Sequence, residues 1–139
     1  MIQNMKITKT LSGPITLTVL LLLLAIPSVN SQEKWEAPES ADKLTNPLKN
    51  DASAVANGKR TYKMLCVICH GAKGKGDGMG GAGLTPKPTD LTNTDVQAQT
   101  DGALFWKLTE GRSPMASYKS ALPEKKRWEL INYIRTLKK

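Results

Sequence analysis

The stretch Cys66-Val67-Ile68-Cys69-His70 decides the fold, and the residues on its two sides differ in character. Before it, Asp51 is a suitable N-cap, and the chain from there to about Cys66 carries apolar or small residues at spacings of three and four, which predicts a helix. After it, residues 71–83 contain seven glycines in thirteen positions, too many for a regular element. We therefore expect the motif at the end of a helix and at the start of a loop.

A Cys-x-x-Cys-His run is the attachment signature for c-type haem. At the end of a helix, two cysteines three residues apart can present their thiols to the two vinyl groups on one edge of a porphyrin. The adjacent histidine then binds the iron from one side. The motif predicts one covalently bound haem c, with Cys66 and Cys69 as the thioether residues and His70 as the proximal iron ligand.

Three other uses of the motif fit the sequence less well. A thioredoxin-like redox pair would need a strand before the motif, and the sequence predicts none. A zinc site of the usual kind needs four ligands, whereas the whole chain has two Cys and one His. A disulfide between residues three apart on a helix is geometrically awkward. Haem attachment is the preferred interpretation.

Two further helices are predicted beyond the loop. Thr100 or Asp101 can cap a short helix that Gly111 ends, and Pro123 suits the first position of a last helix. The apolar stripe of this last helix consists of Leu130, Ile131, Ile134 and Leu137. No strand pattern occurs in the sequence, so the predicted fold class is all-α.

The first fifty residues of the chain predict a leader and an arm. Residues 1–31 have a basic start, an apolar run over 15–26 and small residues before a possible cut, as in a secretory signal peptide. An uncleaved leader that anchors the chain in the membrane is the alternative. Residues 32–50 show no period and contain two prolines, which predicts an extended arm, and residues 51–139 form the domain. We expect export to the periplasm.

The composition limits the partners. The chain has 139 residues and a net charge of +8, but its lysines are spread out and interleaved with acids, which argues against a nucleic-acid interface. Four lysines in loops are expected to surround the exposed edge of the haem and to steer the chain toward redox proteins with acidic docking surfaces: Lys73, Lys75, Lys87 and Lys119. A purely solubilising role for these lysines is the alternative.

From about residue 51 to residue 137 the chain resembles the class I monohaem cytochromes c of bacteria. The matching pieces are residues 58–62, Cys66-Val-Ile-Cys-His-Gly, Gly74-Lys-Gly-Asp-Gly, Pro86-Lys-Pro-Thr-Asp-Leu, Gly111-Arg-Ser-Pro-Met and Trp128-Glu-Leu-Ile-Asn-Tyr-Ile-Arg. The resemblance implies the small cytochrome c fold, in which helices wrap around one haem and the first and last helices cross. Gly58, Tyr62 and Tyr133 match the small and aromatic residues of that crossing.

The second iron ligand is expected to be a methionine. His70 is the only histidine, which excludes ligation by two histidines of this chain, and a thioether favours Fe(II). Met64 precedes the motif on the same helix and cannot reach the opposite face of the porphyrin. Met79 follows His70 by only nine residues, whereas Met115 follows it by 45 and can return on the opposite face. Met115 is the predicted ligand, and Met79 or an open position are the alternatives.

Weaker assignments complete the site. The resembling family usually has proline directly after the ligand methionine, whereas here Pro114 comes before it. In similar cytochromes the imidazole N–H is bound by a backbone carbonyl at a loop proline, which implies Pro86 or its neighbour as the partner of His70. Trp106 and Arg112 are expected near the haem propionates, with a buried wall and a solvated charge as their alternative roles.

Two protein ligands leave no position on the iron for a substrate, so the predicted function is outer-sphere electron transfer between respiratory partners and not catalysis. One alternative is a fixed cytochrome c subunit of a larger membrane-associated oxidoreductase complex, with the 32–50 arm as an interaction strap. A catalytic or sensing role is the third possibility and requires an open iron.

Overall fold

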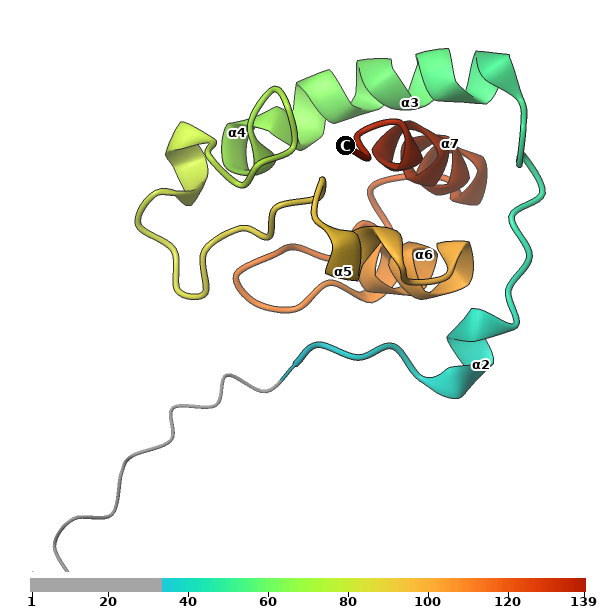
Figure 1. The fold of residues 1–139 in the computed structure, drawn as a ribbon, viewed down its shortest axis with the longest axis horizontal. Coiled ribbons are helices and arrows are strands. Elements are labelled where there is room, and N and C mark those ends of the chain that lie inside the picture. Colours follow the sequence, from blue (N-terminus) through green and yellow to red (C-terminus); the bar gives the residue numbers. More distant parts are fainter. Residues whose placement is uncertain (1–33) are drawn as a thin grey trace, which may run out of the picture. The chain divides into compact units, whose positions relative to one another are not determined.

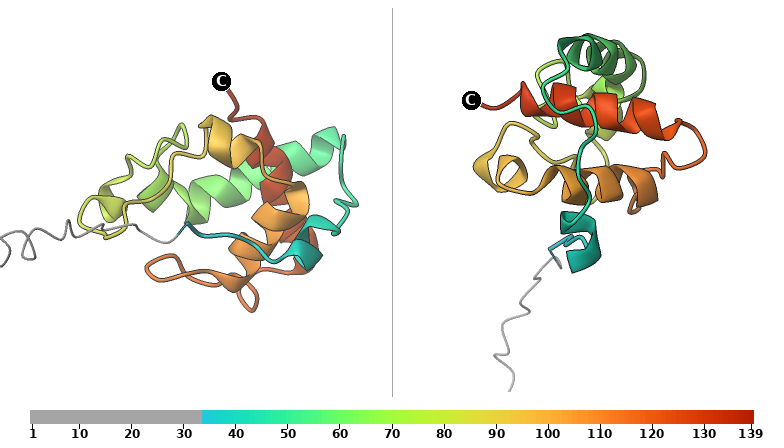
Figure 2. Two further views of the ribbon diagram at one scale, coloured as in Figure 1. Left: turned by 60° about the horizontal axis from the view of Figure 1, so that its bottom comes forward. Right: turned by 90° about the vertical axis from the view of Figure 1, so that its right-hand side faces the viewer.

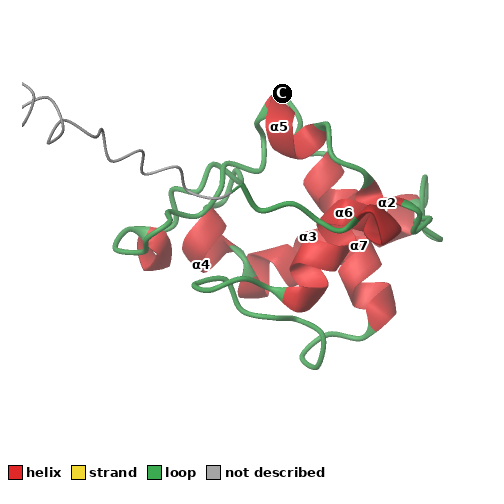
Figure 3. Cartoon of the chain, turned by 90° about the horizontal axis from the view of Figure 1, so that it is seen from below, coloured by secondary structure: helices red, strands yellow, loops and turns green. Residues whose placement is uncertain are grey.

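The computed structural model describes residues 34–139, which contain helices joined by loops and no named strand (Figures 1 and 3). Their order is α2 (Glu39–Asp42), α3 (Ala52–Leu65), α4 (Val67–His70), the 3₁₀ turn η1 (Met79–Gly81), α5 (Thr94–Gln97), α6 (Asp101–Glu110) and α7 (Glu124–Arg135). The all-α prediction is confirmed. None of these helices is long and apolar enough to cross a membrane. The predicted leader, residues 1–31, lies outside the described residues.

Helix α3 begins where the sequence predicts it. The Asp51 carboxylate accepts hydrogen bonds from the backbone N–H groups of Ser53 (2.8 Å) and Ala54 (3.2 Å), which otherwise have no partner in the first turn. The helix ends at Leu65, and Cys66 lies between it and the separate four-residue helix α4. The motif is thus a short turn of its own that continues from α3.

Helices α3 and α7 cross in close contact (Figure 2). A Cβ atom placed on Gly58 would lie 1.9 Å from the carbonyl oxygen of Glu129, so a side chain there would hold the two helices apart. Next to this contact the rings of Tyr62 and Tyr133 lie 5.1 Å apart, tilted by 57°. The crossing that the family resemblance implied is therefore confirmed.

Helix α6 packs against α7 on the other side of the core. Its cap is Thr100, whose hydroxyl accepts from the backbone N–H of Ala103 at 3.0 Å, and Gly111 ends it with a φ of 67°. The Phe105 ring stacks on Trp128 at a centroid distance of 3.9 Å. These aromatic rings join the two tyrosines in one core with Val96, Leu104, Leu108, Leu130 and Ile131.

Three short elements were not predicted. Helix α5 follows Asn93, whose side chain accepts from the backbone N–H of Val96 at 2.8 Å, so it has a regular N-cap. Helix α2 interrupts the arm that was expected to be extended, and it buries Ala41. The 3₁₀ turn η1 forms within the glycine-rich loop. Each spans three or four residues, too few to produce a periodic pattern in the sequence.

The arm, described here from residue 35, belongs to the same compact unit as the helices. Its central contact is the buried Asn46, whose side-chain amide donates to Asp101 Oδ2 (2.9 Å) and to Asn132 Oδ1 (2.7 Å). Asn132 in turn donates to the carbonyl of Leu48 at 2.6 Å. These bonds fix the arm to α6 and α7 at once.

Candidate functional site

The two cysteines of the motif are free thiols, and both are half-buried. Burial raises the pKa of the Cys66 thiol to about 12, and the nearby Cys69 adds to this effect. Redox-active and metal-binding cysteines have the opposite property, a lowered pKa that keeps the thiolate available. No group of three or more His, Cys, Asp and Glu side chains within residues 34–139 is placed to hold a metal ion. The Cys66 environment therefore favours neither a thioredoxin-like pair nor a zinc site.

The imidazole of His70 is held by one backbone carbonyl. Its Nδ1 lies 3.1 Å from the carbonyl oxygen of Thr89, and burial lowers the pKa of His70 despite that hydrogen bond. In the neutral ring, Nδ1–H donates to Thr89 and the Nε2 lone pair can bind a metal. The prediction of Pro86 or its neighbour as the partner is wrong. The acceptor is three residues further on, directly after Pro88, because that part of the loop passes the ring.

The proximal segment, residues 66–78, is held together by the glycine-rich loop. The N–H of Gly76 donates to the carbonyl of His70 (2.9 Å), and the N–H of Gly78 donates to that of Cys69 (3.1 Å). From the core side, the buried Tyr62 hydroxyl donates to the carbonyl of Gly71 at 2.8 Å. The last carbonyl groups of a helix have no hydrogen-bond partner within that helix. The N–H groups of the glycine-rich loop supply such partners for carbonyls of α4.

The three methionines of the described chain differ in exposure. Met64 is 72% exposed and Met79 is 91% exposed, so neither packs into the domain. Met115 is half-buried and packs against the hydrophobic core, as does Cys66. Both of its backbone groups pair with Arg112, at 2.8 and 3.1 Å. Of the three, Met115 has the surroundings that an internal ligand requires.

The distal segment, residues 111–118, also contains a tyrosine that the sequence analysis missed. Tyr118 is half-buried, and its N–H donates to the carbonyl of Leu108 at 3.2 Å. Burial raises the pKa of Tyr118, with smaller contributions from Cys66 and Cys69. A single tyrosine in a loop belongs to no periodic pattern and no motif, so its place at the site could not be predicted from the sequence.

The remaining predicted residues are placed as follows. Trp106 is half-buried, and the Arg112 guanidinium lies over the ring of Trp35, 5.2 Å from its centroid. Their roles toward haem propionates stay predictions. Among the four lysines predicted for docking, Lys119 pairs with the exposed Glu110 at 3.6 Å. The other three are exposed in the loops that follow the motif.

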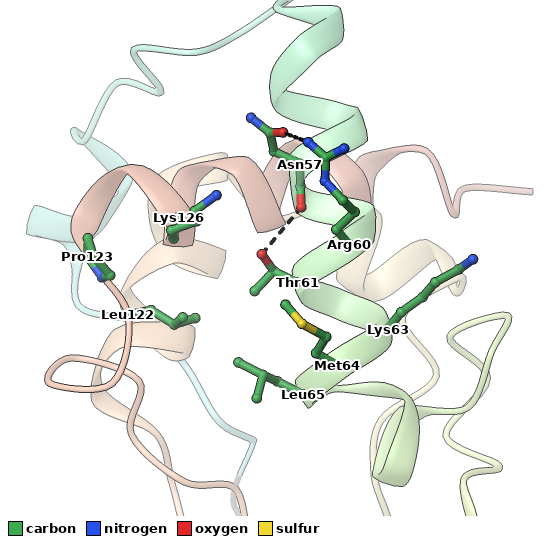
Figure 4. A pocket seen from close by; sticks show the side chains of 9 residues that line it. All are labelled: Asn57, Arg60, Thr61, Lys63, Met64, Leu65, Leu122, Pro123 and Lys126. Atoms are coloured by element: carbon green, nitrogen blue, oxygen red, sulfur yellow. Dashed lines mark hydrogen bonds between the residues drawn. The ribbon is translucent and has the colours of Figure 1, made fainter.

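Two surface grooves lie near the motif. One, of about 660 Å³, lies between the outer face of α3 and the start of α7 (Figure 4). Its lining is largely apolar, from Met64, Leu65 and Leu122, with basic residues at the rim. The other, of about 360 Å³, lies beside α4 and is lined by Ile68 and Met79 among others. Neither is lined by His70 or Met115.

The four predicted haem-binding side chains nevertheless fit haem c. Cys66 and Cys69 are unpaired thiols near the end of α3, and the adjacent His70 has one ring nitrogen fixed and the other available. Met115 offers a thioether packed against the same core as Cys66. A soft sulfur and an imidazole are the usual axial pair of an electron-transfer haem.

Comparisons with known proteins agree with this fit. A family model described as "Cytochrome C oxidase, cbb3-type, subunit III" matches residues 53–134. No curated protein matches the chain. Among solved structures, the chain is similar to one in the Kuenenia stuttgartiensis reducing HAO-like protein complex Kustc0457/Kustc0458, with 26% identity and a TM-score of 0.60 over 77% of this chain and 53% of that one. It therefore spans about half the length of that protein. The KustC0563 c-type cytochrome is 26% identical, with a TM-score of 0.51 over 59% of this chain and 98% of that one.

Proposed function

The chain belongs to the cytochrome c family described by the cbb3-type oxidase subunit III model, as a class I monohaem member, and we propose that it carries electrons through one haem c bound to Cys66 and Cys69. The observation that supports this most directly is the arrangement at His70. Its Nδ1 is fixed by the Thr89 carbonyl, directly beside two free thiols, and its Nε2 is left for the iron.

Each residue of the site has a role in this proposal. When bound, haem c supplies an iron that takes up and releases one electron. The sulfurs of Cys66 and Cys69 would hold the group by thioether bonds, and His70 would bind the iron through Nε2 in an orientation that Thr89 fixes. The Met115 thioether would be the second protein ligand and would raise the potential, because a thioether favours Fe(II). With two protein ligands, the iron would have no position for a substrate and would serve in electron transfer.

The covalent bond is tested by mass. The exported protein, made with a working cytochrome c maturation apparatus, should weigh more than its polypeptide by one haem and should give a haem c pyridine haemochrome spectrum. Cys66→Ala and Cys69→Ala should each lose one thioether bond and most of the bound haem. A colourless protein with the mass of the bare polypeptide would overturn the proposal.

The distal ligand is tested by spectroscopy. Met115→Ala should abolish the sulfur-to-iron absorption band and lower the potential while the covalent mass stays unchanged. Met64→Ala and Met79→Ala are the matched controls and should keep both, because their side chains face solvent. The reduced wild type should not bind carbon monoxide, and Met115→Ala should bind it. Carbon monoxide binding by the wild type would instead favour a catalytic or sensing protein with an open iron.

The partners are proposed to be redox proteins with acidic docking surfaces. Lys73, Lys75 and Lys87 are exposed in the loops after the motif, where their charge can steer an encounter. The rate of electron transfer to the native partner should fall as ionic strength rises. Lys73→Gln combined with Lys75→Gln should reduce the rate and its salt dependence, whereas Lys43→Gln in the arm should not. A rate that is constant from low to high salt would remove the steering role.

Localisation in the periplasm is part of the proposal, and it rests on the signal-peptide pattern of residues 1–31. A second candidate is a fixed cytochrome c subunit of a membrane-associated oxidoreductase complex. It is favoured by the description of the matching family and by the similar chain in the reducing HAO-like complex. Gel filtration of native soluble and membrane fractions separates the two, because a free carrier elutes at its own mass and a subunit elutes with its complex.

A further inference from the structure

The arm runs along α6 and touches both of its ends (Figures 1 and 2). At the start of the helix, Asp42 accepts a hydrogen bond from the Thr100 hydroxyl at 2.6 Å. A Cβ atom on Gly102 would lie 2.0 Å from the carbonyl oxygen of Ala41, so the backbones of α2 and α6 are in direct contact. Beyond the other end of the helix, Trp35 lies against Arg112. The arm therefore reaches the distal segment from the outside.

Trp35 is half-buried and faces two cations. The Lys107 ammonium lies 5.7 Å from its ring centroid, and the Arg112 guanidinium carbon lies 5.2 Å from it. Both distances are within the range of a cation–π attraction, which is strongest for tryptophan. Lys107 is also held by Gln99, to which it donates at 2.5 Å. The indole thus joins a residue fixed on α6 to a residue of the distal segment.

Arg112 is the backbone partner of Met115. Its carbonyl accepts from the Met115 N–H at 2.8 Å, and its N–H donates to the Met115 carbonyl at 3.1 Å. These two bonds form an isolated bridge that closes the turn containing Pro114. Any contact that holds Arg112 in place therefore also limits how far the Met115 side chain can move.

We propose that Trp35 is a positioning residue for the distal iron ligand: by holding Arg112, it keeps the Met115 thioether on the iron and keeps external ligands off it. This inference rests on the proposed function, in which Met115 binds the iron. Trp35 itself contacts neither the iron nor the porphyrin in this proposal. In this proposal the arm restrains the distal segment through the contact of Trp35 with Arg112.

The test is an imidazole titration of the oxidised holoprotein, read by the sulfur-to-iron absorption band. Trp35→Ala should raise the apparent imidazole affinity by about fivefold to tenfold, because the ligand-free position is populated more often. Trp35→Phe keeps an aromatic face and should lie closer to the wild type. Asp42→Ala loosens the opposite end of the arm and is the matched control, with a wild-type affinity expected. Thermal unfolding of each variant shows whether a change in affinity is only a general loss of stability.

The outcomes separate this inference from the proposed function. If Met115→Ala leaves the band unchanged, the assignment of the distal ligand fails. If Met115→Ala abolishes the band but Trp35→Ala binds imidazole as the wild type does, only the positioning role fails. An increase of the same size in Asp42→Ala would also overturn it, because the effect would then belong to the arm in general and not to Trp35.

Discussion

On the His70 side of the site, the glycine-rich loop donates backbone hydrogen bonds to the motif itself, to the carbonyls of Cys69 and His70. On the Met115 side, both backbone groups of the proposed ligand pair with Arg112, which lies against the arm, and the Tyr118 N–H donates to the carbonyl of Leu108 on α6. The proximal segment is thus fixed by residues close to it in sequence and by the crossing of α3 and α7. The distal segment has local bonds too, but its Arg112 also contacts a tryptophan about 80 residues away.

This difference suggests how the two sides respond to disturbance. Local backbone bonds cost little chain entropy to form, because the loop they close is short. A segment that relies partly on a distant contact is expected to open more readily without unfolding the rest of the domain. The distal segment should therefore lose its native structure before the proximal segment does. The following substitutions test this order.

The largest effect is expected at the helix crossing. Gly58→Val places a branched side chain where a single Cβ atom would already lie 1.9 Å from the Glu129 carbonyl. Overpacking of this kind should cost about 3 kcal/mol or more, since the two nearest atoms, the carbonyl oxygen and carbon of Glu129, belong to helix backbone. The proximal and distal segments should unfold together, as measured by thermal unfolding and by the yield of haem-loaded protein. A variant with wild-type stability would show that the crossing is not the common support.

The next effect is expected on the distal side alone. Gly111 has a φ of 67°, and a Cβ atom there would lie 2.5 Å from the backbone nitrogen of Ser117. Gly111→Ala should cost about 2 kcal/mol through strain and displacement of the distal segment. The sulfur-to-iron band should weaken strongly while the covalent haem content stays unchanged. If the band survives and the haem content falls, the order of failure is reversed.

Much of this architecture could be predicted from the sequence because its signals are local. The Asp51 cap, the Cys66–His70 motif and the glycine-rich loop each occupy one continuous stretch. The partner of His70 was misplaced because two prolines occur close together in the loop, and only the path of the loop decides which carbonyl reaches the ring. The contact of Trp35 with Arg112 could not be predicted, because it joins residues far apart in sequence and has no local pattern.

A smaller effect is expected from the bond between the core and the motif. Tyr62→Phe removes the hydroxyl that donates to the buried carbonyl of Gly71 at 2.8 Å. Leaving this acceptor without a partner should cost about 1 to 2 kcal/mol, as measured by denaturant unfolding of the holoprotein. Tyr133→Phe is the control on the other ring of the pair. The imidazole affinity should stay unchanged in both, since this bond supports the proximal segment only.

The smallest effect is expected where the arm meets α6 and α7, and it depends on pH. Asp101 accepts from Asn46 and from Arg135, which lies 2.7 Å away. Burial acts to raise the pKa of Asp101, but these hydrogen bonds and the guanidinium charge outweigh it, so the pKa lies below its ordinary value. The pair is partly exposed, so Asp101→Asn should cost less than about 1 kcal/mol at neutral pH.

The sign of the pH dependence follows from that lowered pKa. The carboxylate stabilises the folded state fully above the unfolded pKa of about 4, and this contribution is lost as the pH falls through the lower folded value. The difference in melting temperature between wild type and Asp101→Asn should therefore be largest near neutral pH and should shrink below about pH 4. Asp95→Asn, at an exposed carboxylate outside this network, is the matched control. Because Asp101 holds the arm at Asn46 and not at Trp35, the sulfur-to-iron band of Asp101→Asn at neutral pH should match that of the wild type. A weakened band in Asp101→Asn would mean that the arm as a whole, and not Trp35, governs the distal side.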